Sequence, residues 1–546
     1  MYKSMIKKTV VLAMLSSVGT GALLRAEAAQ VPSGVQLAEK QQLVRGNGGE
    51  VQSLDPHKIE GVPESNVVSD LFEGLTSTDP EGKVIPAVAT HWQTQDQKVW
   101  IFSLRPNAKW SNGAPVTAED FVYSWRRLAD PKTASVYVSF LQYAHLANID
   151  EIISGKKNTE TLGVKALDAH RLQVTLSEPV SYLPRLLIHV SMAPVYAPAI
   201  KQWGDQWTNP GHMVSNGAYQ LKSHIVNERI ELTRNKQYWD DAHTVINNVI
   251  MLPIPSEVND VNRYLSVNGS DMTYNNLPIE LFKKLKTEHS QELKINPYLT
   301  TYTYEFNNKR PPFNDVRVRT ALKLALDRDI IAKQVLGQGQ QPAYSFTHPA
   351  TDGIKLVPPA WFTLTQQQRN AQAKKLLQEA GYGPNHPLRF SLLYNTSDLH
   401  KKLAIAAASI WKKNLGAIVT LNNQEWKTYL DTRHQGNYDV VRASWTADYD
   451  EPSSFVNYFL SNSSNNTAFY QSANYDKLVA SALASADPVK RADYYQQAEQ
   501  QLDKDSPVIP VFYYVNTRLI KPWVGGYTGK DPLDDLHDKN LYIIKH

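Results

Sequence analysis

The sequence contains no cysteine among its 546 residues. This absence excludes a disulfide framework, a thiolate metal site and, after the N-terminal segment, the cysteine that carries a bacterial lipid anchor. Past residue 28 the chain also has no apolar run of membrane length. With 42% hydrophobic and 20% charged residues, the composition is typical of a soluble globular protein whose stability comes from the size of its core.

Enzyme motifs are also missing. The chain has no G-x-S-x-G, no H-E-x-x-H and no Walker loop, and Gly337-Gln338-Gly339 lacks the third glycine of a dinucleotide loop. The histidines are scattered without metal-ligand spacing, so His212, His400 and His434 are each interpreted first as surface or structural residues. We therefore expect no catalytic residue, no metal and no cofactor.

The charge is small for a chain of this length. The formal net charge is +4, and residues 1–28 hold four basic side chains and one acidic side chain, so the remainder is close to neutral. A near-neutral chain argues against a nucleic-acid or anionic-membrane partner.

The N-terminal segment has the three parts of a secretory signal peptide. Lys3, Lys7 and Lys8 form a basic start, Thr9 to Leu24 is apolar, and Ala26-Glu27-Ala28 is a small-x-small end. We expect cleavage after Ala28 and a periplasmic product. An uncleaved membrane anchor is less favoured, because serines and glycines interrupt a run that is already short for a spanning helix.

The length predicts two or three domains, since one core does not grow to this size. Thr117 to Asp120 is an N-cap signature that predicts a helix through Trp125, and Asp315 to Leu326 is amphipathic. The order strand–helix–strand–helix–strand across residues 388–448 predicts an α/β domain with a mostly parallel sheet. The 28 tyrosines and 12 tryptophans suit a large core or a cleft for amphipathic ligands.

The stretch Asp439 to Phe455 carries the most informative single residue. Its first half, from Val440 to Trp445, has the pattern of a strand, and its second half, with Pro452, has the composition of a turn. Between them lies Asp448, flanked by large aromatic side chains that withdraw it from water. Such a carboxylate needs a cation, which could be a Lys or Arg of the protein or the ammonium of a ligand. An ordinary turn aspartate is the third interpretation.

Several longer segments resemble a known family, the family 5 extracellular solute-binding proteins, which serve ABC peptide importers, and among them the periplasmic oligopeptide binders. The resemblance runs from about Leu43 to His546. Its clearest segments are Asn66 to Gly74, Trp110 to Trp125, Asn216 to Tyr219, Asn307 to Ala325 and Lys521 to Gly526, together with GVPESN, MTYNN, LLYNTSDLHKKLAIA, NQEWKTYLDTRHQG and WTADY.

The resemblance implies an α/β fold in the form of a two-lobe clamp with three domains, mixed sheets and two short hinge crossings. Domain I would be discontinuous and comprise residues 29–73, 197–299 and 516–546. Domain II would comprise residues 74–196, and domain III residues 300–515. The crossings would lie near Leu299–Thr300 and Val515–Asn516.

The resemblance also assigns binding roles by position. Asp448 would pair with the α-ammonium of a peptide, and Arg442 and His400 with its C-terminal carboxylate. Glu60, Gly61 and Val62, together with residues around Ala443 to Thr446, would pair with the peptide backbone as an added strand. The other implied ligand-contacting residues are Trp445, Thr446, Trp426, Tyr137, Asn275, Asn395, Arg433, Glu305, Asn465 and Tyr514.

The implied function is that of a carrier. It would bind short peptides in extended form with little side-chain selection and, as a monomer, deliver them to an inner-membrane permease with its ATPase subunits. A murein-tripeptide or other single-solute binder is the alternative within the family, and a secreted hydrolase the alternative outside it. Nickel or haem carriage is disfavoured by the lack of Met/His clusters. One departure is that relatives often have a cysteine pair where this chain has Thr300 and Thr446.

Overall fold

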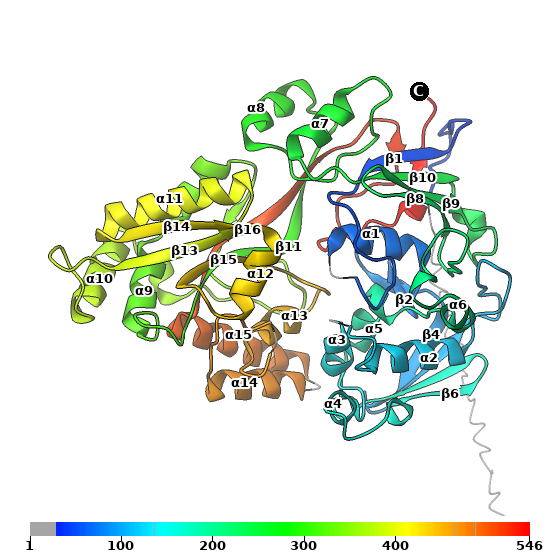
Figure 1. Ribbon diagram of the computed structural model, residues 1–546, viewed down its shortest axis with the longest axis horizontal. Coiled ribbons are helices and arrows are strands. Elements are labelled where there is room, and N and C mark those ends of the chain that lie inside the picture. The colour runs from blue at the N-terminus through cyan, green and yellow to red at the C-terminus, as the bar shows by residue number, and fades with distance from the viewer. Residues whose placement is uncertain (1–28, 60, 136, 464, 486) are drawn as a thin grey trace, which may run out of the picture.

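The computed structural model describes residues 29–59, 61–135, 137–463, 465–485 and 487–546. The predicted signal peptide and Glu60 lie outside the described residues. Figure 1 shows two lobes side by side, one formed by the N-terminal half with the C-terminal segment and one by residues from about 300 to 515. In the described ranges, no helix has the length and apolar character needed to cross a membrane.

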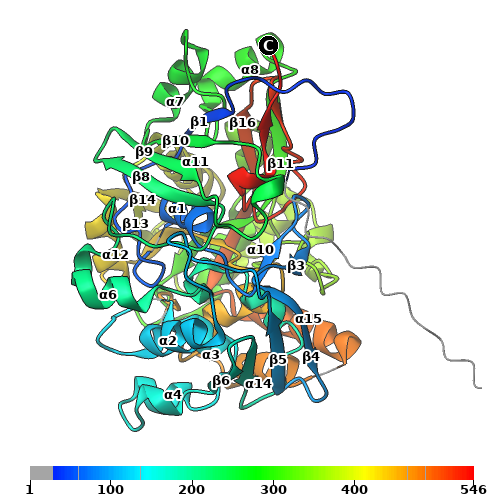
Figure 2. The ribbon, with the colours of Figure 1, turned by 90° about the vertical axis from the view of Figure 1, so that its right-hand side faces the viewer.

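The first lobe contains two four-stranded sheets, in the orders β1-β10-β9-β8 and β4-β5-β7-β6. Only the β1–β10 pair is parallel. The strands of this lobe are β1 (Gln42–Gly46), β2 (Thr76–Thr78), β3 (Val84–Pro86), β4 (Ala89–Thr94), β5 (Val99–Leu104), β6 (Val164–Asp168), β7 (Arg171–Thr175), β8 (Tyr219–Ile225), β9 (Arg229–Arg234), β10 (Asn248–Leu252), β17 (Val524–Gly525) and β18 (Tyr542–Ile543). Its helices are α1 (Val62–Leu71), α2 (Ala118–Ala129), α3 (Val138–Tyr143), α4 (Ile149–Ile153), α5 (Leu183–Leu186), α6 (Ala197–Trp203), α7 (Glu257–Leu265) and α8 (Ile279–Glu288). In both views α7 and α8 lie at the opposite end of the molecule from α4 (Figures 1 and 2).

The second lobe is built on one six-stranded sheet with the order β12-β16-β11-β15-β13-β14. Its strands are β11 (Leu293–Phe306), β12 (Gln341–Pro342), β13 (Arg389–Asn395), β14 (Ile418–Gln424), β15 (Val440–Thr446) and β16 (Val508–Leu519). Its helices are α9 (Val316–Ala325), α10 (Gln366–Glu379), α11 (Asp398–Leu415), α12 (Trp426–His434), α13 (Ser453–Val456), α14 (Ala473–Leu483) and α15 (Pro488–Asp505).

The prediction of a mostly parallel sheet is wrong for the second lobe as a whole. The pairs β13–β14 and β13–β15 are parallel, as the strand–helix–strand order predicts. The pairs β11–β15, β11–β16 and β12–β16 are antiparallel. The physical reason is the path of the chain: β11 enters this lobe and β16 leaves it, so the two run in opposite directions side by side. The mixed sheets implied by the resemblance are confirmed.

The predicted helix starts are confirmed where capping chemistry is strong. Thr117 and Asp120 form a reciprocal capping box at the start of α2, which satisfies N–H groups that the first turn of a helix leaves without partners. Phe121 and Trp125 of α2 are fully buried, so the apolar face of the helix fixes it to the first lobe.

The two predicted crossings lie inside the long strands β11 and β16. Leu293 to Pro297 pair with Val515 to Leu519 toward the first lobe, and pairing resumes at Thr301 with Tyr513 after a register shift. The irregularity falls at the predicted position Leu299–Thr300. Thr300 faces Thr446 across β11 and β15, and their hydroxyl oxygens are 2.8 Å apart.

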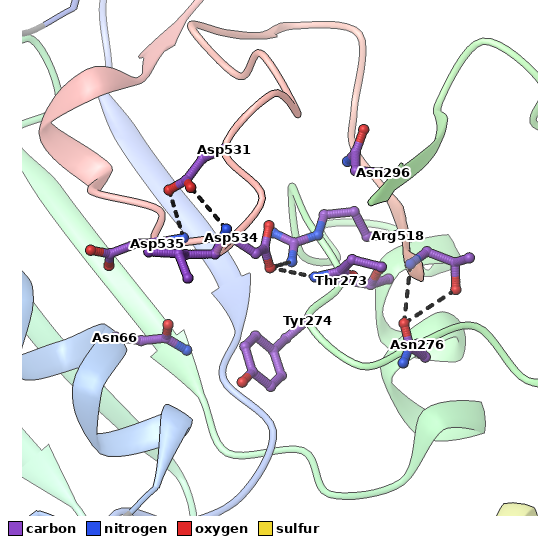
Figure 3. A network of polar contacts seen from close by, with 12 residues as sticks. Asn66, Thr273, Tyr274, Asn276, Asn296, Arg518, Asp531, Asp534 and Asp535 are labelled. Atoms are coloured by element: carbon purple, nitrogen blue, oxygen red, sulfur yellow. Dashed lines mark hydrogen bonds and ion pairs between the residues drawn. The ribbon is translucent and has the colours of Figure 1, made fainter. Parts of the chain in front are cut away.

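A polar network ties the first-lobe end of these strands to the C-terminal segment, as Figure 3 shows. Arg518 of β16 forms an ion pair with Asp534, and the Asn516 amide donates to the same carboxylate. The backbone N–H of Thr517 donates to Asn276 over 3.1 Å. The β16 strand is therefore held on the first-lobe side by its own side-chain and backbone contacts.

Candidate functional site

Strand β15 and the turn after it face the first lobe. The strand lies between β11 and β13 at the centre of the second-lobe sheet. The following turn reaches α3, since the rings of Tyr449 and Phe140 have centroids 6.1 Å apart. In Figure 1, α13 lies opposite α3 and α5. Residues of β15 and its turn are thus placed at the boundary between the lobes, where the sequence predicts the site.

Asp448 is a largely buried carboxylate for which the described part of the chain supplies no ion-pair partner. Burial raises its pKa to about 7. Its backbone N–H donates to the Ser454 hydroxyl over 2.9 Å, which fixes the turn. Tyr143 of α3 faces it from the other lobe: burial and then the Asp448 charge raise the pKa of Tyr143 to about 12. Because the residues that the structure describes bring no cation to this carboxylate, the structure favours the interpretation that a ligand does.

Arg442 lies six positions earlier, on β15, and its surroundings are the complement of those of Asp448. It is buried, and its two terminal nitrogens donate to Asn395 over 3.1 Å and to Ser444 over 3.2 Å. Its guanidinium carbon is 5.0 Å from the Tyr302 ring centroid. Within the described residues no carboxylate forms an ion pair with it, and its Nε has no hydrogen-bond partner.

His400 of α11 lies close enough to Arg442 for the two to interact. Burial and then the Arg442 charge hold the pKa of His400 well below its usual range, so the ring is neutral at pH 7. Its Nδ1 has no hydrogen-bond partner among the described residues. Tyr514 is also close, since its phenol contributes to the raised pKa of Arg442. The structure thus brings together four predicted residues: Arg442, His400, Asn395 and Tyr514.

Glu305 and Arg433, both predicted to line pockets, neutralise each other. The Glu305 carboxylate is 1% exposed and accepts bonds from Arg433 over 3.1 and 3.2 Å, Tyr458 over 2.7 Å and Thr467 over 3.3 Å. A carboxylate with this many donors needs no ligand cation. We therefore interpret this pair as a support of the site's framework.

The start of α1 supplies the described part of the predicted backbone-pairing segment. Gly61 is extended, with φ −130° and ψ 164°, and is the N-cap of α1, while Val62 is the first helical residue. Val62 is thus placed in a helix and not in a strand. Its N–H belongs to the first turn, where N–H groups lack intrahelical partners and are available to an added acceptor.

The other predicted contacts are distributed along the boundary. The Trp445 indole N–H donates to the Ser454 carbonyl over 2.6 Å, and Thr446 is engaged with Thr300. Asn465 reaches across the lobes to the Tyr143 hydroxyl, 3.4 Å away. The Tyr137 ring lies 4.4 Å from the His189 ring in the first lobe.

Asn275 and Trp426 are the two remaining residues that the resemblance implies as ligand contacts. The Asn275 amide nitrogen donates to Ile254 O and to Asp260 within the first lobe, so it is engaged in holding α7. Trp426 begins α12, and its side chain lies outside the described residues.

Three residues near Asp448 were missed by the reasoning from sequence: Tyr449, Tyr143 and Arg185. Tyr449 is completely buried against Tyr182 and Phe140. The Arg185 guanidinium donates to the Asp450 carbonyl. The available signal was a large aromatic residue directly after the candidate anchor, but nothing in the sequence pairs it with residues 140–185.

Comparison with known proteins identifies the class to which this architecture belongs. The model of the bacterial extracellular solute-binding proteins, family 5, matches residues 83–467. The chain belongs to this family.

Particular relatives are similar over nearly the whole length. The periplasmic oligopeptide-binding protein OppA of Salmonella typhimurium is 67% identical over 95% of this chain and 96% of its own. In the crystal structure of Haemophilus influenzae OppA in complex with the peptide RPPGFSPFR, the OppA sequence is 51% identical to this one. The match covers 93% of this chain and 100% of the OppA chain, and the superposition has a TM-score of 0.86.

The unliganded open form of MppA, a periplasmic murein tripeptide-binding protein, superposes less well. It is 45% identical, covers 94% of this chain and 99% of its own, and gives a TM-score of 0.76. The whole chain thus superposes better on the peptide complex than on this open form.

Proposed function

We propose that this protein is the periplasmic solute-binding component of an ABC importer, which binds short peptides in extended form between its lobes and delivers them to an inner-membrane permease and its ATPase subunits. The observation that carries the proposal is the Asp448 carboxylate, which faces the opposite lobe and has no cation partner among the described residues. The relatives that bind oligopeptides support the same ligand class.

Two complementary charges, Arg442 on β15 and Asp448 in the turn after it, suggest how the ends of a peptide would be held. Asp448 would take the ammonium, and Arg442, supported by neutral His400, the carboxylate of a ligand of suitable length. Six residues of strand span at most ~20 Å at ~3.3 Å per residue, and the turn and the arginine side chain shorten this. Peptide main chain is the same in every sequence, so backbone pairing gives affinity without side-chain selection, and hydrated pockets accept different side chains.

The proposed closure is a movement between the predicted domains. Domains I (29–73, 197–299 and 516–546) and II (74–196) would move together against domain III (300–515), with bending at the register shift in β11 and the adjacent part of β16. Small-angle scattering should show a smaller radius of gyration with saturating peptide than without it. An unchanged radius would contradict closure about these strands.

Export through a cleaved signal peptide is part of the same proposal. Cleavage after Ala28 gives a monomeric periplasmic protein that begins at Ala29. Intact-mass analysis of the periplasmic form tests it, and a mass that retains residues 1–28 contradicts a freely diffusing carrier.

The deciding experiment is calorimetry with a tripeptide and its N-acetylated form. We expect the free peptide to bind and the acetylated peptide to bind much more weakly, because acetylation removes the cation that Asp448 requires. Equal affinities would overturn the role of Asp448.

A binder of one specialised solute is the alternative, and the similarity to MppA keeps it in view. Native mass spectrometry of protein purified from its own periplasm separates the two. Heterogeneous short peptides support a general carrier, and a single defined mass supports a specialist. Recovery of intact test peptides after long incubation excludes a peptidase.

A further inference from the structure

The turn directly after Asp448 inserts an aromatic side chain into the opposite lobe. Tyr449 is 0% exposed. Its ring stacks on Tyr182 with centroids 6.1 Å apart and planes inclined by 9°, and it meets Phe140 edge-on at 6.1 Å. Apart from Tyr449, the buried residues of that hydrophobic core all belong to residues 43–272 and 520–543. Tyr449 is thus the fully buried residue that the second lobe contributes to the first lobe's core, and the partly buried Leu483 of α14 packs against the same core.

The next residue is tied to the same lobe by hydrogen bonds. Arg185 of α5 donates to the Asp450 carbonyl and forms an ion pair with Asp352. The Asp450 carboxylate in turn accepts the Asp352 backbone N–H over 2.8 Å. The Arg185 and Asp352 side chains are 34% and 62% exposed, so this contact lies at the rim of the boundary.

Glu451, the third residue of this segment, is held by contacts within the second lobe. Buried Glu451 accepts the Ser453 N–H over 2.7 Å and the Tyr495 hydroxyl over 3.0 Å, and Arg491 Nε lies 3.7 Å from its carboxylate. Arg491 also donates to Ser181 of the first lobe. The Tyr449 hydroxyl is 2.9 Å from the Ser453 hydroxyl, so the ring is held by the same turn that positions Asp448 through Ser454.

We propose that Tyr449, Asp450 and Glu451 form a closure wedge, a set of positioning residues that couples capture of the ligand ammonium at Asp448 to docking of the two lobes. The inference rests on the proposed function. Because Asp448 and Tyr449 are consecutive and share one rigid turn, placing Tyr449 between Tyr182 and Phe140 also places Asp448 opposite Tyr143. Separation of the lobes would expose the Tyr449 ring to water and release Asp448 from its low-polarity surroundings.

In this proposal the wedge stabilises the closed state without touching the ligand. Its effect on binding can therefore be distinguished from that of Asp448. A residue that only favours closure changes the apparent affinity of every ligand that closure retains by the same factor. The change falls mainly on the dissociation rate, since closure follows encounter. Loss of Asp448 itself instead discriminates between ligands that have and lack an ammonium.

The test measures association and dissociation rates of a free tripeptide and its N-acetylated form by stopped flow. In Tyr449→Ala we expect dissociation of both peptides to accelerate by the same factor, roughly 10- to 100-fold, with association changed less than about threefold. Tyr449→Phe keeps the stacked ring and should stay close to the wild type. Arg185→Gln, at the exposed rim, should accelerate dissociation about two- to fivefold.

Arg171→Gln is the matched control, because Arg171 forms an exposed ion pair with Asp168 inside the first lobe, with N and O 2.6 Å apart. It should leave both rates unchanged. If Tyr449→Ala fails to fold, Arg185→Gln and the addition of Tyr182→Leu in the first lobe carry the test. Unchanged dissociation in the folded wedge variants, or acceleration confined to the free peptide, overturns the wedge. Failure of the wild type to bind either peptide instead overturns the proposed function.

Discussion

Glu305 and Asp448, two carboxylates of the second lobe that are withdrawn from water, have opposite surroundings. Glu305 lies on β11 and accepts bonds from Arg433, Tyr458 and Thr467. Asp448 follows the neighbouring strand β15, and burial raises its pKa to about 7. Among the described residues, it has no cation.

The difference shows how a binding site can be recognised from its energetics. A charge withdrawn from water is costly unless it is paired. At Glu305 the protein supplies the counter-charge, so the carboxylate contributes to the framework. At Asp448 the described part of the chain supplies no counter-charge, so we propose that the counter-charge comes with the ligand and that the cost is recovered only on binding.

The largest effect on peptide affinity is expected from Asp448→Asn, which keeps the shape of the side chain and removes its charge. Leaving a buried ammonium without its partner costs ~2–5 kcal/mol, which is roughly 30-fold to several thousand-fold in affinity. Calorimetry with a free tripeptide measures it, and the N-acetylated peptide should lose little. Binding within about threefold of the wild type would place the anchor elsewhere.

Glu305→Gln should reverse the pattern, with stability lost and ligand discrimination kept. Removing the partner leaves the Arg433 charge buried, which lowers the free energy of unfolding by about 3–5 kcal/mol. Urea denaturation measures this change. Adding Arg433→Met should recover much of the loss, because the uncompensated charge is then gone. A stable single variant with lost preference for free amines would mean that Glu305, too, serves the ligand.

Peptide affinity should depend on pH through Asp448. Above pH of about 7 the carboxylate is ionised and attracts the ammonium, whereas below it protonation removes the charge. We expect affinity for a free peptide to fall by up to about tenfold per pH unit below 7. Asp448→Asn should abolish this dependence, and a slope that persists in the variant would assign it to another group.

The same raised pKa gives the empty protein a stability contribution of known sign. Protonation of Asp448 stabilises the folded state, fully so below its ordinary pKa of 3.8, and this contribution is lost as pH rises through about 7. Comparing denaturation of wild type and Asp448→Asn between these limits isolates it.

The smallest effect is expected from Thr467→Val, which removes the longest of the bonds to Glu305, 3.3 Å. Since Arg433 and Tyr458 still satisfy the carboxylate, we expect a loss of about 0.5–1.5 kcal/mol in the free energy of unfolding. Peptide affinity should not change. A larger loss would mean that pairing with Arg433 is weaker than its geometry indicates.

Local elements could be predicted because their signals are local. The capping box at Thr117 and the strand–helix alternation across residues 388–448 follow from nearby residues. The crossing near Leu299–Thr300 is implied by the resemblance and stays a prediction. The parallel-sheet prediction failed because β11 and β16 come from distant parts of the chain, and their direction is set by the passage between lobes.

The sequence by itself determined the absence of a disulfide framework, the family membership and the position of Asp448 at a strand end beside aromatic residues. Only the tertiary structure decided which buried charges are paired. Glu305 is matched by Arg433, 128 residues away. Asp448 meets Tyr143 and, within the described ranges, no cation, and Tyr449 packs into the opposite lobe. Electrostatic and packing energies depend on distance in space, and the fold sets that distance independently of separation along the chain.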